Sequence, residues 1–552
     1  MAGFSSSSHY VESQKQFREA SPLNLRQQVI CAIMAGLGFS VFITIHIFFT
    51  LVTLDSNAAP NIPSTDTLFQ EHEPALKYDI LSKANEKWPE LIHQDQNISN
   101  NAKKFKEFGE RFFRRTSKKF QQSSVDCSAL YAGDARSVRR AVGISKVLAS
   151  LEKVKHAKSE RTVKLKWLES IPRPPKLVER EVKTWPTWEF QRLTNLWYVR
   201  ATRNCERFIQ TRGYITSPLT LEEEEFPIAF SLIVYKDIEM VERLLRSVYR
   251  PQNRYCIHVD LKADPEFLMA VKAVARCFRD NVRMSSERVA VKWGTFSVLE
   301  PELICMRDLL AVDSGQAPGL AWGWTKGGAG RERPKWKYFL TLTGQEFPLK
   351  TNFELVKILK AFNGANNQEG TIETAEKERW EVPPPHGIRP VKGSIHTIIN
   401  RATVDFIINS PVAKDFLAWL WDTKFPDETL FASINYNPQL GIPGTYNGSD
   451  MERVTQFARF KKWYIEPWVR VCPSRLVVRD ICILSIGDLR DLAESPNLFA
   501  NKFFLDQDRI VVGCLEEKLF NDTRDEFLEK KTFSTEHYAN QDFVINQVRT
   551  PL

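Results

Sequence analysis

The stretch that decides the fold is Phe230-Ser-Leu-Ile-Val-Tyr235, then an amphipathic run over 236–249, then Tyr255-Cys-Ile-His-Val-Asp260. In the central run apolar residues recur at spacings of three and four, which predicts a helix with one buried face. Two β-rich runs around one helix form a strand–helix–strand unit, and such units build parallel α/β sheets. Ligands bind such sheets at the carboxyl ends of the strands, so we expect Asp260 at the ligand site.

The same stretch excludes two kinds of nucleotide site. No Gly-x-Gly-x-x-Gly and no Gly-Lys-Ser/Thr loop accompanies the unit, which argues against a dinucleotide fingerprint and a P-loop. A nucleotide-sugar site needs neither loop and stays open. The 552 residues, 43% of them hydrophobic, suffice for one large domain or two ordinary ones with appendages. A formal charge of +9 is modest for this length and does not by itself indicate a nucleic-acid partner.

An apolar run from Val29 to Leu54 lacks Lys, Arg, Asp and Glu. It exceeds the ~20 residues that a bilayer-spanning helix needs. A cleaved signal peptide is the alternative, but its apolar core measures only ~7–15 residues. Basic residues in the preceding tail, 1–28, place that tail in the cytoplasm and everything after Leu54 in the lumen. We therefore expect a retained transmembrane signal anchor at 29–54.

The cysteines and sequons fit a lumenal chain. Of nine cysteines, Cys31 lies in the apolar run and the other eight follow it. An even number in such a compartment predicts four disulfides, although sequence alone does not fix their pairing. A zinc site would need clustered Cys-x-x-Cys pairs, which the chain lacks. Three glycosylation sequons begin at Asn97, Asn447 and Asn521.

Composition divides the lumenal part into three. Residues 55–125 are polar and look like a stem, 126–196 are a basic neck or linker, and 197–540 have the composition of a compact α/β catalytic domain. Within the stem, the stretch 103–122 mixes basic residues with five phenylalanines. We interpret it as an amphipathic helix that lays phenylalanine onto the next domain, rather than as a nucleic-acid surface.

Two further segments stand out in the catalytic part. Glu222–Glu225 precedes the first strand and is expected to be a solvated turn. Ser314–Pro334 is rich in Gly and Trp without periodicity, which indicates a long surface insertion.

Beyond the opening unit, a series of short motifs carries a family resemblance. Each is weak alone, but together they run over about 300 residues in a fixed order. They are Cys305-Met-Arg-Asp-Leu309, Trp336-Lys-Tyr338, Glu346-Phe-Pro-Leu-Lys-Thr-Asn352, Phe425-Pro-Asp-Glu428, Val478-Arg-Asp-Ile-Cys482, Gly487-Asp-Leu489 and Leu498-Phe-Ala-Asn-Lys-Phe503. The chain thereby resembles the core-2/I-branching β-1,6-N-acetylglucosaminyltransferase family, whose superfamily also includes peptide xylosyltransferases. The resemblance implies a single-pass type II Golgi enzyme with a GT-A-like, Rossmann-like fold, a UDP-sugar donor and inversion at the anomeric carbon.

The resemblance also assigns the chemistry. Glu428 matches the family's catalytic base, which takes the proton of the acceptor hydroxyl; without the family it would read as an acidic residue in the first turn of a helix. Arg479 and Lys502 match the two cations that hold the UDP diphosphate, and together they can replace a divalent ion. Asp506-Gln-Asp508 imitates a metal motif, but we interpret it as a turn and expect neither a metal nor a cofactor.

The substrate contacts are implied in the same way. Ile233, Tyr235 and Asp260 lie where the family holds uridine and ribose, with Trp293 beside them; Tyr235 stands in place of the family's usual His. On the acceptor side the matches are Glu378, Arg379 and Trp463, while Ile465 replaces a Tyr. The implied disulfides are Cys127–Cys514, Cys205–Cys277, Cys256–Cys305 and Cys472–Cys482.

The expected activity is transfer of GlcNAc from UDP-GlcNAc to a 6-hydroxyl of a glycoprotein O-glycan of the core 1 type. Two alternatives stay open. UDP-glucose or UDP-xylose could be the donor, or the chain could be a catalytically silent lumenal lectin or scaffold. The expected partners are the donor, the acceptor glycoprotein and the membrane, without nucleic acid, and a homodimer is left open.

Overall fold

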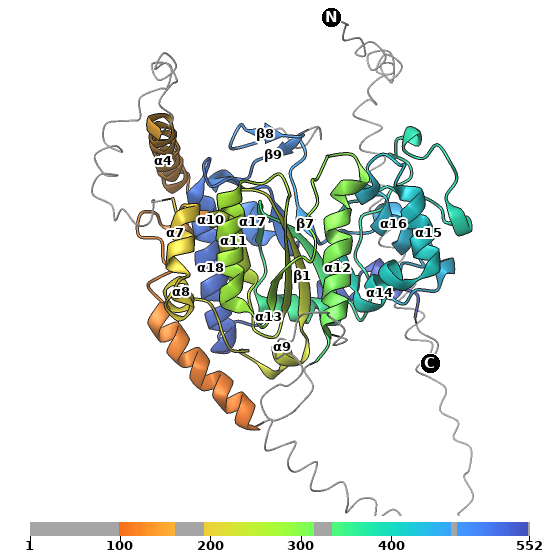
Figure 1. The fold of residues 1–552 in the computed structure, drawn as a ribbon. Helices are drawn as coiled ribbons and strands as arrows, with labels where there is room; N and C mark the ends of the chain where they lie inside the picture. The colour runs from red at the N-terminus through yellow and green to blue at the C-terminus, as the bar shows by residue number, and fades with distance from the viewer. Residues whose placement is uncertain (1–98, 160–191, 314–333, 465–471, 550–552) are drawn as a thin grey trace, which may run out of the picture. The chain divides into compact units, whose positions relative to one another are not determined.

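The computed structural model describes residues 99–159, 192–313, 334–464 and 472–549 (Figure 1). The predicted anchor at 29–54, the sequon at Asn97 and residues 314–333 of the predicted insertion lie outside these ranges. Within the described residues, no helix combines the length and the apolar character needed to cross a membrane.

A mixed sheet of five strands forms the centre, in the order β3-β2-β1-β4-β6. Its first four strands are parallel and β6 runs antiparallel at the edge. The bounds are β1 Ile228–Val234, β2 Arg254–Val259, β3 Val282–Met284, β4 Tyr338–Thr343 and β6 Ile398–Asn400. The strand–helix–strand unit predicted from the sequence is thus confirmed as β1, α10 (Ile238–Val248) and β2.

Alternation along β1 builds a core on each face of the sheet. Phe230 and Leu232 belong to the cluster with α10, α11 (Pro265–Ala275) and α13 (Asn352–Ala361). Ala229 belongs to the opposite cluster, with α12 and three later helices. The sheet therefore lies between two helical layers, as Figure 1 shows for α10 and α11 on one side and α12 on the other. The bounds of the opposite layer are α12 Glu300–Asp313, α14 Arg401–Asn409, α15 Pro411–Leu420 and α16 Leu430–Asn435.

A smaller, three-stranded sheet joins the C-terminal part to this body. Its strand order is β5 (Glu346–Pro348), β10 (Phe499–Asn501) and β7 (Arg459–Phe460). A two-stranded hairpin, β8 (Val477–Val478) and β9 (Ile481–Cys482), lies nearby in sequence. The helices that follow are α17 Leu489–Glu494, α18 Arg509–Phe527, α19 Glu536–Ala539 and α20 Asp542–Ile545.

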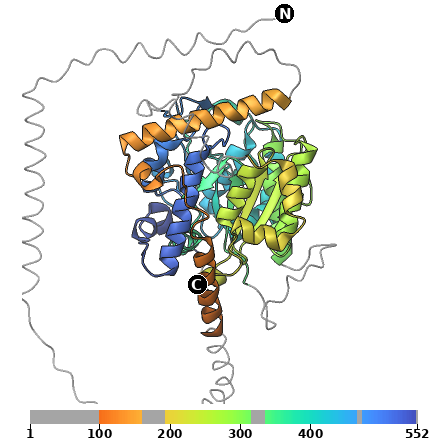
Figure 2. The same cartoon turned by 90° about the vertical axis from the view of Figure 1, so that its left-hand side faces the viewer.

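Two N-terminal helical segments pack against α18. The segment 99–116 is helical, and Phe113 packs its ring against Phe520 and Phe527 of α18 at centroid distances of 5.7 and 5.3 Å. The predicted amphipathic helix with buried phenylalanines is therefore confirmed. Figure 2 shows the helices of this region along one side of the body. The bounds are α3 Cys127–Tyr131, α4 Ala135–Ser159, α7 Asn195–Ala201 and α8 Cys205–Arg212.

The solvated turn predicted at Glu222–Glu225 is wrong. These residues form a short helix, α9 (Leu221–Glu225), capped by the side chain of Thr220. Glu223 is buried and accepts a 2.6 Å hydrogen bond from Asn352 at the start of α13. Glu223 therefore takes part in a buried hydrogen bond, which the run of charges in the sequence does not indicate.

Candidate active site

The carboxyl ends of β1, β2 and β4 meet at one edge of the sheet. Asp260, directly after β2, donates its backbone N–H to the carbonyl of Val234 at the end of β1 over 3.0 Å. Tyr235, the next residue, accepts a 3.0 Å hydrogen bond at its hydroxyl from Gln345, which follows β4. The structure thus gathers the predicted nucleoside residues at the place where parallel sheets bind ligands.

The predicted nucleoside residues differ in exposure. The ring of Tyr235 is 51% exposed and that of Trp293 is 62% exposed, so both are open to a ligand. Asp260 is 14% exposed and already receives the backbone N–H of Lys262. Ile233 lies within β1 and packs against the core on the α12 side. The main role of the Ile233 side chain is therefore to pack against the core.

Arg479 occupies the tight turn of the β8–β9 hairpin. Arg479 and Asp480 are the two turn residues, and both have positive φ, 53° and 58°. Positive φ at both positions is the requirement of a type I′ turn, which normally takes Gly, Asn or Asp. An Arg held in this conformation is costly, and such residues cluster at functional sites. The turn carries the exposed Arg479 at the tip of the hairpin.

Lys502 lies beside this hairpin. It follows β10, and its Nζ donates to the carbonyl of Val478, one residue before Arg479, over 3.5 Å. Burial lowers the pKa of Lys502, and the charge of Arg479 lowers it further. The two predicted phosphate-binding cations therefore lie close enough to repel each other, an arrangement that an anionic ligand would relieve.

Glu428 ends the short helix η7 (Pro426–Glu428) just before α16. One of its carboxylate oxygens, Oε2, accepts a 2.8 Å hydrogen bond from Arg379, which is buried, while Glu428 itself is 36% exposed. Among the described residues, its other oxygen, Oε1, has no hydrogen-bond partner. Arg379 therefore fixes the carboxylate in place and leaves one oxygen available to a substrate proton.

A run of aromatic and cationic contacts joins Glu428 to the diphosphate cations. Arg379 lies 4.6 Å from the ring of Phe425, and that ring packs 4.9 Å from the ring of Trp293. Arg479 in turn lies 5.4 Å from the ring of Trp293. These contacts connect Glu428 with Arg479, and Lys502 adjoins the hairpin that carries Arg479, although the three residues are far apart in sequence.

Asp427 gives the loop a second carboxyl group. Burial raises its pKa to about 7, and the adjacent charge of Glu428 contributes to the rise. Two neighbouring carboxyl groups with different surroundings can hold different protonation states. Here the half-buried Asp427 retains its proton more readily than an exposed carboxyl would, and Glu428 lies 2.8 Å from Arg379.

The acceptor side is only partly assembled from the predicted residues. Trp463 pairs by a β-bridge with Ile481 beside the hairpin, and Lys461 lies 5.4 Å from its ring. Glu378 is exposed on η5 (Lys377–Arg379), with no contact in the described part of the chain. Ile465 falls outside the described residues.

Lys461 is a candidate that sequence reasoning missed. Burial lowers its pKa, whereas the carboxylates of Glu369, Glu346 and Glu428 oppose that change. Its Nζ makes one long hydrogen bond, 3.5 Å to Ser394. Nothing in the sequence distinguishes it from the neighbouring Lys462, because only the fold decides which lysine turns inward.

A buried ion-pair cluster supports the floor of the site. Glu346 and Arg459 are both fully buried and lie 2.8 Å apart. Asn501, which precedes Lys502, donates to Glu346 over 3.1 Å. His396 lies 3.3 Å from Glu346, and burial together with nearby cations holds its pKa well below its usual range. His396 is therefore neutral, and the cluster anchors the end of β10 that carries Lys502.

The turn predicted for the Asp-x-Asp sequence is confirmed. Asp506 is exposed in a turn, and Asp508 is the N-cap of α18, accepting the backbone N–H groups of Ile510 and Val511. Its other oxygen accepts the N–H of Ile486. In the described ranges no three His, Cys, Asp or Glu side chains gather as metal ligands.

Sequence comparison places this site in a known family. The profile of the Core-2/I-Branching enzyme family matches residues 228–316 and 329–493. The chain is 37% identical over 357 residues to a bovine β-1,3-galactosyl-O-glycosyl-glycoprotein β-1,6-N-acetylglucosaminyltransferase, covering 59% of this chain and 78% of the relative. The human relative of that name is 36% identical over 352 residues (58% and 76%), and that of bovine herpesvirus 4 is 37% identical over 357 (59% and 75%).

The chain belongs to the core-2/I-branching enzyme family. It is thus a member of a family of glycosyltransferases. The profile leaves out residues 317–328, which fall inside the insertion predicted at 314–334. All four implied disulfides are confirmed: Cys127–Cys514, Cys205–Cys277, Cys256–Cys305 and Cys472–Cys482. The first ties α3 to α18, and the third ties β2 to α12.

Two of the predicted glycosylation sites are described, and they differ in setting. Asn447 is exposed directly after Tyr446, which forms an isolated β-bridge with Gln547. Asn521 lies within α18, where its side chain accepts a 2.9 Å hydrogen bond from Arg524, and the sequon residue Thr523 is buried. Glycosylation of Asn447 and Asn521 stays a prediction, with Asn447 the more accessible.

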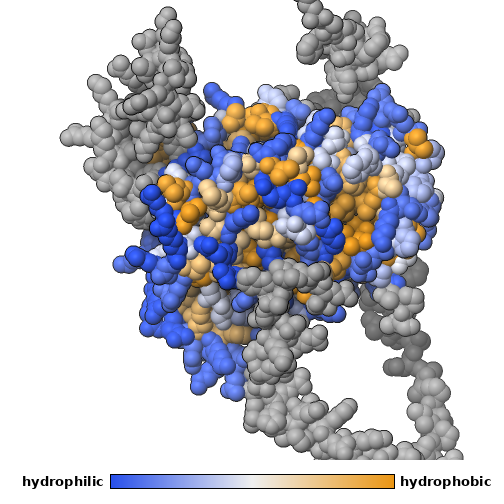
Figure 3. Space-filling view, viewed as in Figure 1, coloured by the Kyte–Doolittle hydropathy of each residue, from blue (hydrophilic) through white to orange (hydrophobic). Residues whose placement is uncertain are grey.

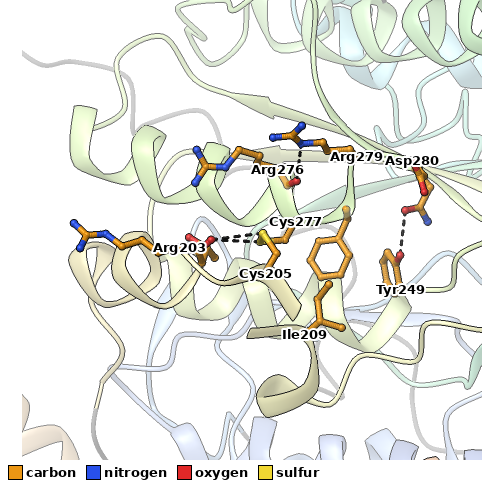
Figure 4. A pocket seen from close by; sticks show the side chains of 11 residues that line it. Arg203, Cys205, Ile209, Tyr249, Arg276, Cys277, Arg279 and Asp280 are labelled. Atoms are coloured by element: carbon orange, nitrogen blue, oxygen red, sulfur yellow. Dashed lines mark hydrogen bonds between the residues drawn. A yellow bond between two sulfur atoms is a disulfide. The ribbon is translucent and has the colours of Figure 1, made fainter. Parts of the chain in front are cut away.

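A surface pocket of about 770 Å³ lies away from this site (Figure 4). It is lined by the Cys205–Cys277 disulfide, by the residues around it and by exposed arginines such as Arg203 and Arg276. In Figure 4 these two arginines extend outward rather than converging on one point. None of the predicted catalytic, donor-binding or acceptor-binding residues lines this pocket.

Proposed function

We propose that this chain is an inverting glycosyltransferase that transfers GlcNAc from UDP-GlcNAc in β-1,6 linkage to an O-glycan of a glycoprotein. The single observation that carries the proposal is the run of contacts from Glu428 through Arg379, Phe425 and Trp293 to Arg479. These contacts support a site in which one available carboxylate oxygen and a pair of cations serve one reaction, as a direct displacement between an acceptor hydroxyl and a departing diphosphate requires.

The reaction follows from that arrangement. Glu428 takes the proton of the acceptor 6-hydroxyl while the oxygen of that hydroxyl attacks the anomeric carbon. The bond from that carbon to UDP breaks, and the electron pair leaves with the diphosphate. Arg479 and Lys502 stabilise the negative charge that develops there. Because attack and departure occur on opposite faces, an α-linked donor gives a β-linked product.

The proposals about domains, membrane anchor, compartment and acceptor rest on membership of the same family. The described sheet fits a GT-A-like domain, to which we assign 197–540, behind a neck at 126–196 and a stem at 55–125. We further propose a type II anchor at 29–54, with the catalytic part in the Golgi lumen. The relatives' names specify a galactosyl-O-glycosyl-glycoprotein acceptor, which supports a core 1 glycan here. We also propose metal independence, because Arg479 and Lys502 supply two positive charges that can hold a diphosphate without a divalent ion.

Replacing Glu428 by Gln tests the mechanism. The amide cannot take a proton, so we expect turnover to fall by about 10²–10⁴-fold while UDP still binds. A matched control is Glu225→Gln, which alters an exposed carboxylate at the end of α9, before β1 and away from its carboxyl end, and should change the turnover number little. Undiminished turnover by the Glu428 variant would remove the mechanism.

A panel of donors tests the activity itself. The full chain is assayed with UDP-GlcNAc, UDP-glucose and UDP-xylose on a core 1 acceptor, with and without EDTA. We expect UDP-GlcNAc to be preferred and EDTA to leave the rate unchanged. Preference for another donor would replace the proposed sugar, loss of activity in EDTA would contradict metal independence, and the absence of turnover with every donor would favour a silent lectin or scaffold.

A further inference from the structure

Four aromatic side chains form a continuous surface beside Glu428. We name Trp293, Phe296, Trp421 and Phe425 the aromatic ledge. Phe296 and Trp421 pack at a centroid distance of 4.8 Å, and Trp293 and Phe425 at 4.9 Å. The two pairs are held together because Phe425 donates its backbone N–H to the carbonyl of Gly294 over 3.2 Å, and because η3 (Phe296–Val298) contacts η7.

The ledge is open to solvent at both ends. Trp293 is 62% exposed and Trp421 is 61% exposed. The space-filling view shows separate hydrophobic patches among hydrophilic side chains on the face that carries α11, α12 and α15 (Figure 3). Exposed apolar surface that is contiguous and rimmed by polar side chains is typical of ligand-binding sites.

The outer end of the ledge, Trp421, has no structural duty that requires exposure. It caps the C-terminus of α15 through its backbone, which any residue could do. Among the described residues its indole N–H has no acceptor, whereas the nearby Trp419 donates its indole N–H to the carbonyl of Val382 over 2.9 Å. Trp421 thus offers both an apolar face and an unused hydrogen-bond donor.

We propose that the outer end of the aromatic ledge, Trp421 with Phe296, binds a further sugar of the acceptor glycan, one beyond the unit that carries the reacting hydroxyl, while Trp293 stays on the donor side. This inference rests on the proposed function and extends it to substrate selection. A pyranose ring has an apolar face of C–H groups and a rim of hydroxyls. The flat ring of Trp421 can stack on the apolar face of the sugar. The indole N–H of Trp421 and the exposed side chains of Asp422 and Lys424 can form hydrogen bonds with the hydroxyls.

The position of the ledge supports a glycan as the occupant. Trp421 and Phe425 lie on the segment between α15 and α16 that also carries Glu428, so the ledge and the proposed base share one connecting segment. A polypeptide held by aromatic anchors would instead need a deep, desolvated pocket. The pocket in Figure 4 lies elsewhere on the molecule.

The test compares three acceptors on the full chain and on its Trp421→Ala variant. The first is a core 1 disaccharide on a small aglycone, the second is the same disaccharide extended by further sugars on its outer residue, and the third is the disaccharide on a peptide. We expect Trp421→Ala to raise KM for the extended acceptor by about three- to ten-fold, the loss of one aromatic contact, with kcat unchanged. The other two acceptors should keep their KM, and Trp421→Phe should restore most of the loss.

Controls separate the ledge from folding and from the proposed function. Trp197→Ala removes another partly exposed indole on α7 and should change KM for none of the acceptors. Equal effects of Trp421→Ala on all acceptors, no effect on any, or an effect confined to the peptide would each overturn the proposal. If the unmodified chain turns over no acceptor, the proposed function fails. The ledge is then tested by calorimetric binding of the extended glycan, which Trp421→Ala must weaken.

Discussion

Replacing Arg479 by Gly should separate the stability of the β8–β9 hairpin from its chemistry. Arg479 has a φ of 53°, a left-handed conformation that costs a side-chain-bearing residue about 1–2 kcal/mol and costs Gly nothing sterically. Gly loses about 0.5–1 kcal/mol of backbone entropy in return. The variant also loses the contact with Trp293, worth about 0.5–1 kcal/mol at an exposed position.

These terms nearly cancel, so Arg479→Gly should leave the free energy of unfolding within about 1 kcal/mol of the parent. The chain offers a matched control in Arg475, which is exposed, has a φ of 55° and belongs to no predicted contact. Arg475→Gly gains the conformational relief without losing a ring contact. It should therefore raise the free energy of unfolding by up to about 1 kcal/mol.

The turnover number, unlike the free energy of unfolding, should change strongly in Arg479→Gly and not in Arg475→Gly. Without Arg479 the departing diphosphate keeps only Lys502, and losing one fixed donor to such a charge typically lowers kcat by about 10²–10³-fold. Arg475→Gly should leave kcat unchanged. Urea midpoints report stability, and initial rates at saturating UDP-GlcNAc report turnover. The reasoning is refuted if Arg479→Gly unfolds markedly more easily than the parent, or if it transfers sugar at the parent rate.

Two further predictions concern buried carboxyl groups. Burial raises the pKa of Asp427 from 3.8 to about 7, so the folded state holds this proton more tightly than the unfolded chain, and its contribution to stability is lost as pH rises through that interval. Asp427→Asn should therefore gain stability relative to the parent between about pH 4 and about pH 8 in urea titrations, and a constant difference would contradict this. Asp508→Ala should cost about 1–3 kcal/mol, because it strips an acceptor from three backbone N–H groups at the start of α18 and at Ile486. Asp508→Asn, which keeps one acceptor oxygen, should cost clearly less, and equal losses in the two variants would argue against the cap.

Local sequence pattern was enough to predict the elements in which apolar residues recur at a regular spacing. The strand–helix–strand unit of β1, α10 and β2 follows from apolar spacing, because a buried strand and a one-faced helix each leave a distinct period. The phenylalanines of the helix at 99–116 follow from the same logic. The burial of Glu223 in the acidic run Glu222–Glu225 could not be predicted from local pattern. Its hydrogen-bond partner, Asn352, lies 129 positions along the chain.

Pairings over long distances required the resemblance to the family. Eight lumenal cysteines have many possible pairings, and no local rule chooses Cys127–Cys514 across 387 positions. The same holds for the site, since nothing near Glu428 in the sequence indicates that Arg379 would fix its carboxylate. Family order supplied these residues, and the fold then explains why they meet.

The residues that escaped prediction share one physical property. Lys461, Phe425 and Trp421 are each unremarkable in composition, and their significance comes from direction: a lysine turned inward, and two rings placed along the approach to Glu428. Direction depends on backbone conformation, which for Phe425 is a positive φ of 54°, as it is for the predicted Arg479 at 53°. These strained positions carry no sequence signature, since Arg and Phe are not the residues that such conformations favour. The most informative parts of this active site are therefore those where the local preference of the chain is overruled, as expected where function rather than stability selects the conformation.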